Sequence, residues 1–286
     1  MVEENNLKKL KEIFLMIVML EYLLRTGILF GLLTGIFLAI GFILGGYDGL
    51  LFSLILSFFL NIFSYYYSDK IVLGIYNAKP LKNKKIESIL ENLSKKAEIP
   101  KPSLYLVETD IPNAFATGRS PKHSAIAVTS GLIERLNDEE IEGVLAHEIA
   151  HIKNRDVLLA TLAAVFASAI VYIAYMFRFS YKRENYLSGL LLIIFAPLIA
   201  TIIRLAISRT REYAADYGSA IITKNPSGLI RALEKITQYS RSKSFHGNAA
   251  TSHLWIVNPF KGGLEDLFST HPSVEKRIER LKNIKL

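Results

Sequence analysis

The chain has 286 residues, of which 51% are hydrophobic and 21% charged, and its formal net charge is +8. The hydrophobic residues cluster in four long runs, which excludes an ordinary soluble enzyme and a disordered chain. Because there is no cysteine, a disulfide framework, a thiolate zinc site and a cysteine nucleophile are excluded. In a chain with membrane spans, a basic balance favours cytoplasmic flanks near anionic lipid, so we expect no nucleic-acid partner.

The N-terminal segment, residues 1–26, has a basic start and a short apolar stretch at residues 13–20, which Glu21 and Arg25 follow. The apolar stretch is short for a signal peptide, charges follow it, and no cleavage site between small residues is visible. We therefore predict an N-terminal amphipathic helix that lies along the membrane surface.

Four runs that are almost free of charge are long enough to cross a hydrocarbon core of ~30 Å as helices. These runs are residues 27–46, 49–67, 157–177 and 187–207. A buried helix of a soluble protein is the alternative for any single run, but four such runs are hard to bury in a chain this short. We expect four transmembrane helices in a lipid bilayer, arranged as the hairpins 27–67 and 157–207.

The remaining polar sequence forms two blocks, residues 68–156 and 208–286. Because two spans separate them, both blocks lie on the same side of the membrane as the N-terminus. The charges next to the spans give a mixed orientation signal. The turn at residues 47–49 has no positive charge, which favours a cytoplasmic N-terminus, whereas the loop 178–186 carries three basic residues.

The first polar block has both helical and strand patterns. Residues 83–98 place apolar side chains on one face of a helix, and residues 103–108 and 124–129 are typical of strands. Asn137 precedes three acidic residues, a pattern that starts a helix, because either Asn137 or Asp138 can cap it and acids favour its positive end. The predicted fold class is α+β, mainly α, on a polytopic membrane protein.

The helix that Asn137 starts contains the motif HExxH, within EGVLAHEIAHIKN. His147 and His151 are four residues apart, so they share one face of the helix and can bind one zinc ion per chain. Glu148 directly follows the first histidine, where its carboxylate can accept a proton from water as a general base. A chance motif is the alternative, with an expectation of ~0.01 in a chain of this composition.

A catalytic zinc site needs a third protein ligand and an open position. Asn154 and Val157 occupy the positions where a metzincin has glycine and histidine, which excludes that class. Glu212 and Asp216 are four residues apart on a predicted helix, which fits a ligand and a carboxylate that holds a ligating imidazole. A solvated acidic face is the alternative for this pair, and His271 is the main rival of Glu212 as the ligand.

The combination of these motifs resembles the HtpX-like family of integral membrane zinc metalloproteases, relatives of the CAAX prenyl proteases. The resemblance covers roughly residues 27–286. Its matching stretches are SYYYSDKIVLGIYNAK at 64–79, PNAFATGR at 112–119, AIAVTSGLIERLNDEEIEGVLAHEIAHIKNRD at 125–156, AISRTREYAAD at 206–216 and LFSTHPSVEKRIERL at 267–281.

The resemblance implies a gluzincin-like site in which His147, His151 and Glu212 bind zinc and Glu148 is the base. It also implies four spans in the plasma or inner membrane with the catalytic domain in the cytosol, which decides the mixed charge signal. The substrates that it implies are membrane and misfolded proteins, cut as part of quality control in a stress response.

Three further residues are weaker candidates for the second shell or for substrate binding. Residues 113–115, with Asn113 first, and the strand 124–129 are expected to form a sheet edge on which a substrate adds as another strand. Ordinary core packing is the alternative. In the family pattern His271 and Arg277 lie near the site, and His271 could donate a hydrogen bond to an oxyanion.

Two other functions remain open at this point. The first is a prenyl-protein processing protease, although those relatives have more than four spans. The second is a non-catalytic membrane scaffold with a vestigial zinc site, although the set of His147, Glu148, His151 and Glu212 is intact.

Overall fold

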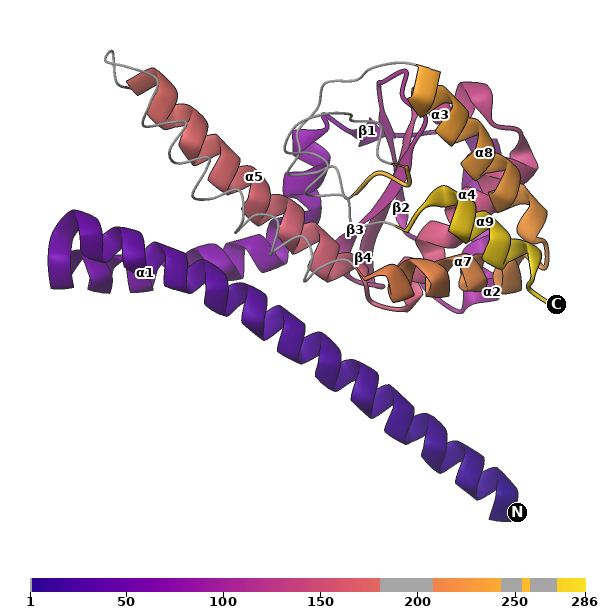
Figure 1. Ribbon diagram of the computed structural model, residues 1–286, viewed down its shortest axis with the longest axis horizontal. Helices are drawn as coiled ribbons and strands as arrows, with labels where there is room; N and C mark the ends of the chain where they lie inside the picture. Colours follow the sequence, from indigo (N-terminus) through magenta and orange to yellow (C-terminus); the bar gives the residue numbers. More distant parts are fainter. Residues whose placement is uncertain (1, 181–207, 243–253, 258–271) are drawn as a thin grey trace. The chain divides into compact units, whose positions relative to one another are not determined.

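The computed structural model describes residues 2–180, 208–242, 254–257 and 272–286 (Figure 1). These residues belong to two units, Met1–Ile62 and Phe63–Leu286. The fourth predicted span, residues 187–207, and the candidate His271 lie outside the described residues.

The first unit is built from α1 (Val2–Ile75) up to Ile62, and in this element two helices meet at a pair of glycines. Gly46 has φ 57° and ψ −138°, a backbone conformation that only glycine adopts readily. Beyond this turn the two helices are joined by a hydrogen bond, in which the Asn61 side-chain amide donates to Thr34 Oγ1 at 3.0 Å. The hairpin of the prediction is therefore present, and its turn lies just before the predicted residues 47–49.

The first helix of α1 runs without a break through residue 26, where the prediction divided a surface helix from the first span. Residues 1–26 are thus not a separate element, because nothing in this stretch ends a helix: it contains neither proline nor glycine, and the first glycine of the chain is Gly27. That this part lies on a membrane surface stays a prediction.

One helix in the described part of the chain, Gly45–Ile75, is long and apolar enough to cross a membrane. Two shorter apolar helices, Leu23–Ala39 and Val157–Ser168, coincide with parts of the first and third predicted spans. On the long helix, Phe52 and Phe59 are 67% and 62% exposed. A row of exposed large apolar side chains is rare on a soluble protein and is typical of a surface that faces lipid.

The second unit contains a four-stranded sheet in the order β1-β2-β4-β3. Its strands are β1 (Lys79–Pro80), β2 (Ser103–Val107), β3 (Ala114–Ser120) and β4 (His123–Thr129). β2 and β4 are parallel, and the other two pairs are antiparallel. The predicted strands at 103–108 and 124–129 are therefore confirmed as β2 and β4.

The expectation that residues 124–129 form a sheet edge is wrong, because β4 lies between β2 and β3. Residues 125–129 are buried at every position, as in a strand that is covered on both faces. The edge strand next to β4 is β3, of which the predicted sheet edge included only the first residues, within 113–115.

The helices of the second unit gather beside the sheet with α4 (Asp138–Lys153) among them (Figure 1). The others are α2 (Lys84–Ala97), α3 (Ser130–Arg135), α5 (Val157–Ser180), α7 (Arg209–Thr223), α8 (Pro226–Ser242) and α9 (Val274–Lys282). α4 packs against α2, α7, α8 and β3. Gly143 allows the close approach of α8, since a Cβ at this position would collide with the main chain of Leu229.

The start of α4 follows the prediction. The Asn137 side chain accepts a hydrogen bond from the Glu140 amide at 3.0 Å, and the Glu140 carboxylate accepts one from the Asn137 amide at 2.9 Å. Such a capping box satisfies two amides that a helix leaves without partners. From there Val144, Leu145 and Ile149 point into the core, where they are fully buried.

The end of α4 is joined to α5 by a turn of only three residues, 154–156. Arg155 has φ 61°, the left-handed conformation that stops a helix. The carbonyl of Asp156 then accepts a hydrogen bond from the Ala160 amide, the first bond of α5. The helix with the two histidines is thus coupled directly to the apolar helix that was predicted as the third span.

Candidate metal centre

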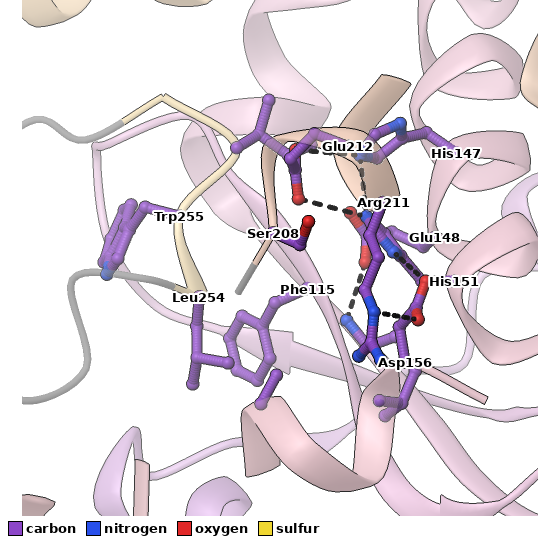
Figure 2. A pocket seen from close by; sticks show the side chains of 14 residues that line it. Phe115, His147, Glu148, His151, Asp156, Ser208, Arg211, Glu212, Leu254 and Trp255 are labelled. Atoms are coloured by element: carbon purple, nitrogen blue, oxygen red, sulfur yellow. Dashed lines mark hydrogen bonds and ion pairs between the residues drawn. The ribbon is translucent and has the colours of Figure 1, made fainter. Parts of the chain in front are cut away.

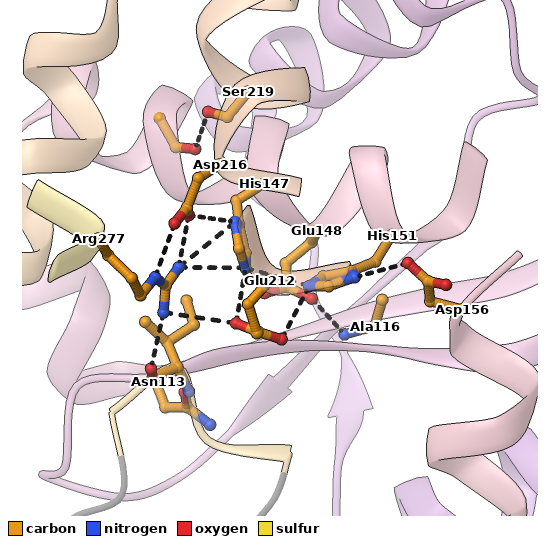
Figure 3. A network of polar contacts seen from close by, with 12 residues as sticks. Asn113, Ala116, His147, Glu148, His151, Asp156, Glu212, Asp216, Ser219 and Arg277 are labelled. Carbon is orange, nitrogen blue, oxygen red and sulfur yellow. Dashed lines mark hydrogen bonds and ion pairs between the residues drawn. The ribbon is translucent and has the colours of Figure 1, made fainter. Parts of the chain in front are cut away.

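Three side chains from α4 and α7 converge on one point (Figure 3). The Nε2 atoms of His147 and His151 are 3.2 Å apart. The carboxylate of Glu212 lies 3.4 Å from Nε2 of His151 and 3.9 Å from Nε2 of His147. These are the residues that the spacing and the resemblance assigned to the metal, and the structure brings them together as a group that could hold an ion.

The donor set fits a zinc ion. Zinc bonds of ~2.0–2.1 Å in tetrahedral geometry separate two ligand atoms by about 3.3 Å. The separations of 3.2 and 3.4 Å are close to this value, and the third, 3.9 Å, is longer. The other ring nitrogen of each histidine, Nδ1, faces a carboxylate, which places the proton there and leaves a lone pair on Nε2. Two lone pairs and a carboxylate oxygen that face one another are unfavourable unless a cation lies between them.

The inner side of the site is a buried ion pair. Nδ1 of His147 lies 3.0 Å from Asp216 Oδ1. Arg277 donates to both oxygens of this carboxylate, with Nη2 at 2.7 Å and Nε at 2.9 Å. Burial alone would raise the pKa of Asp216, but the Arg277 charge and the hydrogen bonds lower it to about 2. Burial alone would lower the pKa of Arg277, yet Asp216 raises it above its usual range, so the pair stays ionised.

The two histidines differ in their affinity for a proton. Burial lowers the pKa of His147, and the hydrogen bond to Asp216 does not compensate. Burial also acts to lower the pKa of His151, but the hydrogen bonds to Asp156 and Glu212 outweigh it and raise this pKa well above its usual value. The carboxylates around His151 therefore favour a positive charge, which either a proton or a metal ion supplies.

Glu148 directs its carboxylate toward the sheet, where Oε2 accepts a hydrogen bond from the Ala116 amide of β3 at 2.8 Å. Burial raises the pKa of Glu148 to about 7; the His151 charge acts against this shift and the Glu212 charge adds to it. A carboxylate with a pKa near neutrality can both accept and return a proton. This is the property that a general base beside a metal site needs.

A cleft opens beside these groups (Figure 2). It encloses about 560 Å³ of empty space, which includes space open to solvent. One side is polar, with His147, Glu148, His151 and Glu212, and Phe115, Leu254 and Trp255 form an apolar wall opposite. The cleft therefore places an apolar wall opposite the candidate metal ligands.

Asn113 holds that wall in place. Its amide nitrogen donates to the Leu254 carbonyl at 3.4 Å, and its oxygen accepts from the Ile256 amide at 2.9 Å. Arg277 Nη1 donates to the carbonyl of Ile256 at 3.2 Å. Two of the weaker candidates, Asn113 and Arg277, are thus brought to the site, where both fix the segment 254–256.

Two residues at the site had no role in the sequence analysis. Asp156 has Oδ2 3.3 Å from Nδ1 of His151. Trp255 lines the cleft and donates from its indole nitrogen to the Tyr76 hydroxyl at 3.2 Å. An acidic residue five positions after the second histidine is the available signal for Asp156, whereas the position of Trp255 depends on contacts far along the chain.

Comparison with known proteins agrees with this geometry. The family described as Peptidase family M48 matches residues 80–285. The chain belongs to peptidase family M48. It is 48% identical over 274 residues to the "Protease HtpX homolog" of Pyrococcus furiosus, a match that covers 91% of this chain and 95% of that protein. It is also 48% identical over 266 residues to the protein of the same name from Aquifex aeolicus, covering 87% and 88%.

A solved structure shares the fold of this M48 chain. The crystal structure of S. mikatae Ste24p matches with a TM-score of 0.50 and 20% identity. The match covers 92% of this chain and 64% of the Ste24p chain, so this chain spans less than two thirds of that protein. The family and the HtpX relatives make this chain a membrane metalloprotease, and the likeness to Ste24p concerns the fold alone.

Proposed function

We propose that this M48 peptidase uses one zinc ion per chain to hydrolyse peptide bonds of membrane or misfolded proteins on the cytosolic side of the cell membrane. The observation that supports this most is the convergence of His147, His151 and Glu212 beside the buried carboxylate of Glu148. The name that the relatives share, "Protease HtpX homolog", supports the same function.

In the proposed mechanism each residue has one task. When bound, zinc would act as a Lewis acid, which lowers the pKa of water to ~7 and polarises the carbonyl of the peptide bond to be cut. Glu148 accepts the proton of the attacking water and returns it to the amine that leaves. The amide of Ala116, which donates to Glu148, keeps the carboxylate turned toward the cleft.

At the sheet edge formed by β3, few main-chain groups remain to hydrogen-bond with the main chain of a substrate. On β3 the Ala116 amide already donates to Glu148, and the Gly118 amide donates to Thr161 Oγ1 at 3.2 Å. Addition of a substrate strand is therefore confined to the first residues of β3, next to Phe115 in the cleft wall. A short unfolded stretch meets this requirement better than a rigid domain does.

The proposed topology has spans at 27–46, 49–67, 157–177 and 187–207, with both polar blocks in the cytosol. The apolar, exposed helix Gly45–Ile75 supports it. The turn of three residues between α4 and α5 also supports it, because it brings the cleft close to the start of an apolar helix. Loops of membrane proteins and unfolded segments near the bilayer are then the accessible substrates.

The function is tested by zinc content and casein cleavage in Glu148→Gln. The variant should keep stoichiometric zinc and lose ~10²–10⁴-fold in cleavage, because an amide cannot accept the proton. A chelator should abolish cleavage by the parent. Glu142→Gln neutralises a carboxylate of the same helix away from the metal site and serves as the control. Activity of Glu148→Gln within tenfold of the parent would remove Glu148 as the base, and a parent that holds zinc but cuts nothing would favour the scaffold.

The topology is tested with single cysteines, since the chain has none of its own. Lys101 and Lys282 are exposed and serve as positions in the two polar blocks, and Ser180 serves for the loop between the third and fourth spans. In intact cells an impermeant thiol reagent should label position 180 and spare 101 and 282. Labelling of 101 but not 282 would place His147 and Glu212 on opposite sides of the membrane and contradict the site itself.

A further inference from the structure

Asp156 lies at the junction of α4 and α5 and uses both of its carboxylate oxygens. Oδ2 is 3.3 Å from Nδ1 of His151, and Oδ1 is 3.3 Å from Nε of Arg211. The three side chains are only 13%, 14% and 18% exposed. Arg211 directly precedes Glu212 on α7, so one carboxylate contacts both helices that form the metal site.

The local backbone explains how Asp156 reaches His151. The two positions are five residues apart in sequence, a spacing that on a continuous helix would not bring the side chains together. The left-handed Arg155 ends α4, and the Asp156 amide donates back to the His151 carbonyl at 3.0 Å. This turn folds the Asp156 side chain over the last turn of α4 and against the imidazole.

We propose that Asp156 is a positioning residue of the metal site. By accepting a hydrogen bond from Nδ1–H of His151 it fixes the tautomer and the orientation of the ring, so that Nε2 presents its lone pair to the ion. By holding Arg211 it keeps the first turn of α7, and with it Glu212, close to α4. This inference rests on the proposed zinc peptidase function and adds a residue to it.

The arrangement is the outer counterpart of the contact between Asp216 and His147, where a carboxylate paired with an arginine also faces Nδ1. Partners that orient a ligating histidine contribute about 10–100-fold to metal affinity or activity. The main chain of Asp156 has a separate role, because its carbonyl accepts the first hydrogen bond of α5. A change in its side chain leaves that main-chain bond intact, so the positioning role can be tested without removing the start of the helix.

The test compares Asp156→Ala, Asp156→Asn and Asp156→Glu in the full-length protein. Zinc affinity is measured by competition with a chelator, and the absorption bands of the cobalt-substituted protein report the geometry of the ligands. Asp156→Ala should bind zinc about 10–100-fold more weakly and should change the cobalt spectrum. Asp156→Asn, whose oxygen still accepts a hydrogen bond but has no charge, should lie between Asp156→Ala and the parent, and Asp156→Glu should restore part of the affinity.

Glu142→Gln, at a half-buried position of α4 that contacts Lys96 and not the metal site, is the matched control and should change neither measurement. Arg211→Gln keeps the contact of Asp156 with His151 and should weaken zinc binding less than Asp156→Ala does. Thermal unfolding of the metal-free proteins separates positioning from folding, because a positioning residue should leave this transition unchanged.

Zinc affinity of Asp156→Ala within threefold of the parent, or a parental cobalt spectrum, would overturn the inference. A lower unfolding temperature of metal-free Asp156→Ala, with an equally large fall in Asp156→Asn, would also overturn the inference. The role of Asp156 would then be structural. A parent protein that binds no zinc and cuts no casein would instead contradict the proposed function. The two failures are therefore distinguishable.

Discussion

The two imidazoles of the metal site have the same type of partner but different surroundings. On the inner side His147, Asp216 and Arg277 have side chains that are 2%, 3% and 0% exposed. On the outer side His151, Asp156 and Arg211 are 14%, 13% and 18% exposed, at the edge of the cleft. In each case the order is imidazole, carboxylate, guanidinium.

This difference in exposure separates two kinds of contribution. Charges that are fully buried are costly when one partner is removed, because the other is left without compensation. Charges that solvent partly reaches cost less when a partner is removed, since water screens part of the charge that remains. The inner ion pair should therefore contribute to the stability of the fold as well as to the metal site, and the outer one mainly to the metal site.

The largest effect is expected from Glu212, which contacts both halves. Glu212→Ala removes one of three ligands, so zinc affinity should fall by more than the ~10–100-fold typical of outer-shell changes, to about 10³-fold or beyond. The zinc content of the purified variant after dialysis measures this. If Glu212→Ala retains metal as the parent does, the third ligand is another residue, and His271→Ala becomes the variant to measure.

Asp216→Asn should separate the inner half from the outer half. Because Arg277 then stays buried next to a neutral amide and, within the described part of the chain, keeps only the Glu212 carboxylate, at 3.5 Å, as an ion-pair partner, the free energy of unfolding of the metal-free protein should fall by up to about 3–5 kcal/mol. Zinc affinity should fall ~10–100-fold as well. Asp156→Asn should lower the zinc affinity but leave the free energy of unfolding unchanged. Denaturant unfolding in detergent and chelator competition give the two quantities.

The double substitution Asp216→Leu with Arg277→Met is the control for this prediction. Replacing both charges with apolar side chains of similar size should restore the stability that the unpaired charge costs, but neither the hydrogen bond from Arg277 to the Ile256 carbonyl nor the zinc affinity. If stability stays low in the double variant, packing around these residues and not the unpaired charge would explain the loss.

A smaller effect is expected from the wall of the cleft. Asn113→Ala leaves the Leu254 carbonyl and the Ile256 amide without their partner, which should cost about 1–3 kcal/mol of unfolding free energy. Since the wall contacts the substrate and not the metal, KM for casein should rise more than kcat falls, and zinc content should not change. Asn283→Ala, at an exposed hydrogen bond after α9, is the control. A loss of zinc in Asn113→Ala would contradict this separation of wall and metal.

The residues of the metal centre could be predicted because helical periodicity determines their positions. His147 and His151 are one turn apart on α4, and so are Glu212 and Asp216 on α7, whichever way the two helices pack. The capping pattern at Asn137 predicted where α4 begins. Local rules were sufficient for each helix, whereas the family resemblance assigned Glu212, and not His271, as the third ligand.

Residues whose positions depend on turns or on distant packing could not be predicted in this way. Asp156 reaches His151 only because Arg155 leaves the helical conformation. Asn113 binds a segment that is 141 residues away in sequence, a pairing that no periodicity shows. The central position of β4 depends on the strand order of the sheet, which the sequence pattern does not give. The unbroken run of apolar and buried residues in β4 was nevertheless a usable signal for a central strand.

The smallest effect is expected at the opposite end of α4, where another arginine and carboxylate meet. Arg231 pairs with Glu139, and their side chains are 40% and 49% exposed. Because solvent reaches both, Arg231→Ala should change the free energy of unfolding by at most ~1 kcal/mol and leave zinc affinity unchanged. Denaturant unfolding of the metal-free protein measures this beside Asp216→Asn. The pair has the same chemistry as the inner ion pair, a guanidinium and a carboxylate, but not its burial. A loss at Arg231 as large as that at Asp216 would show that burial does not separate the inner half of the site from the outer half.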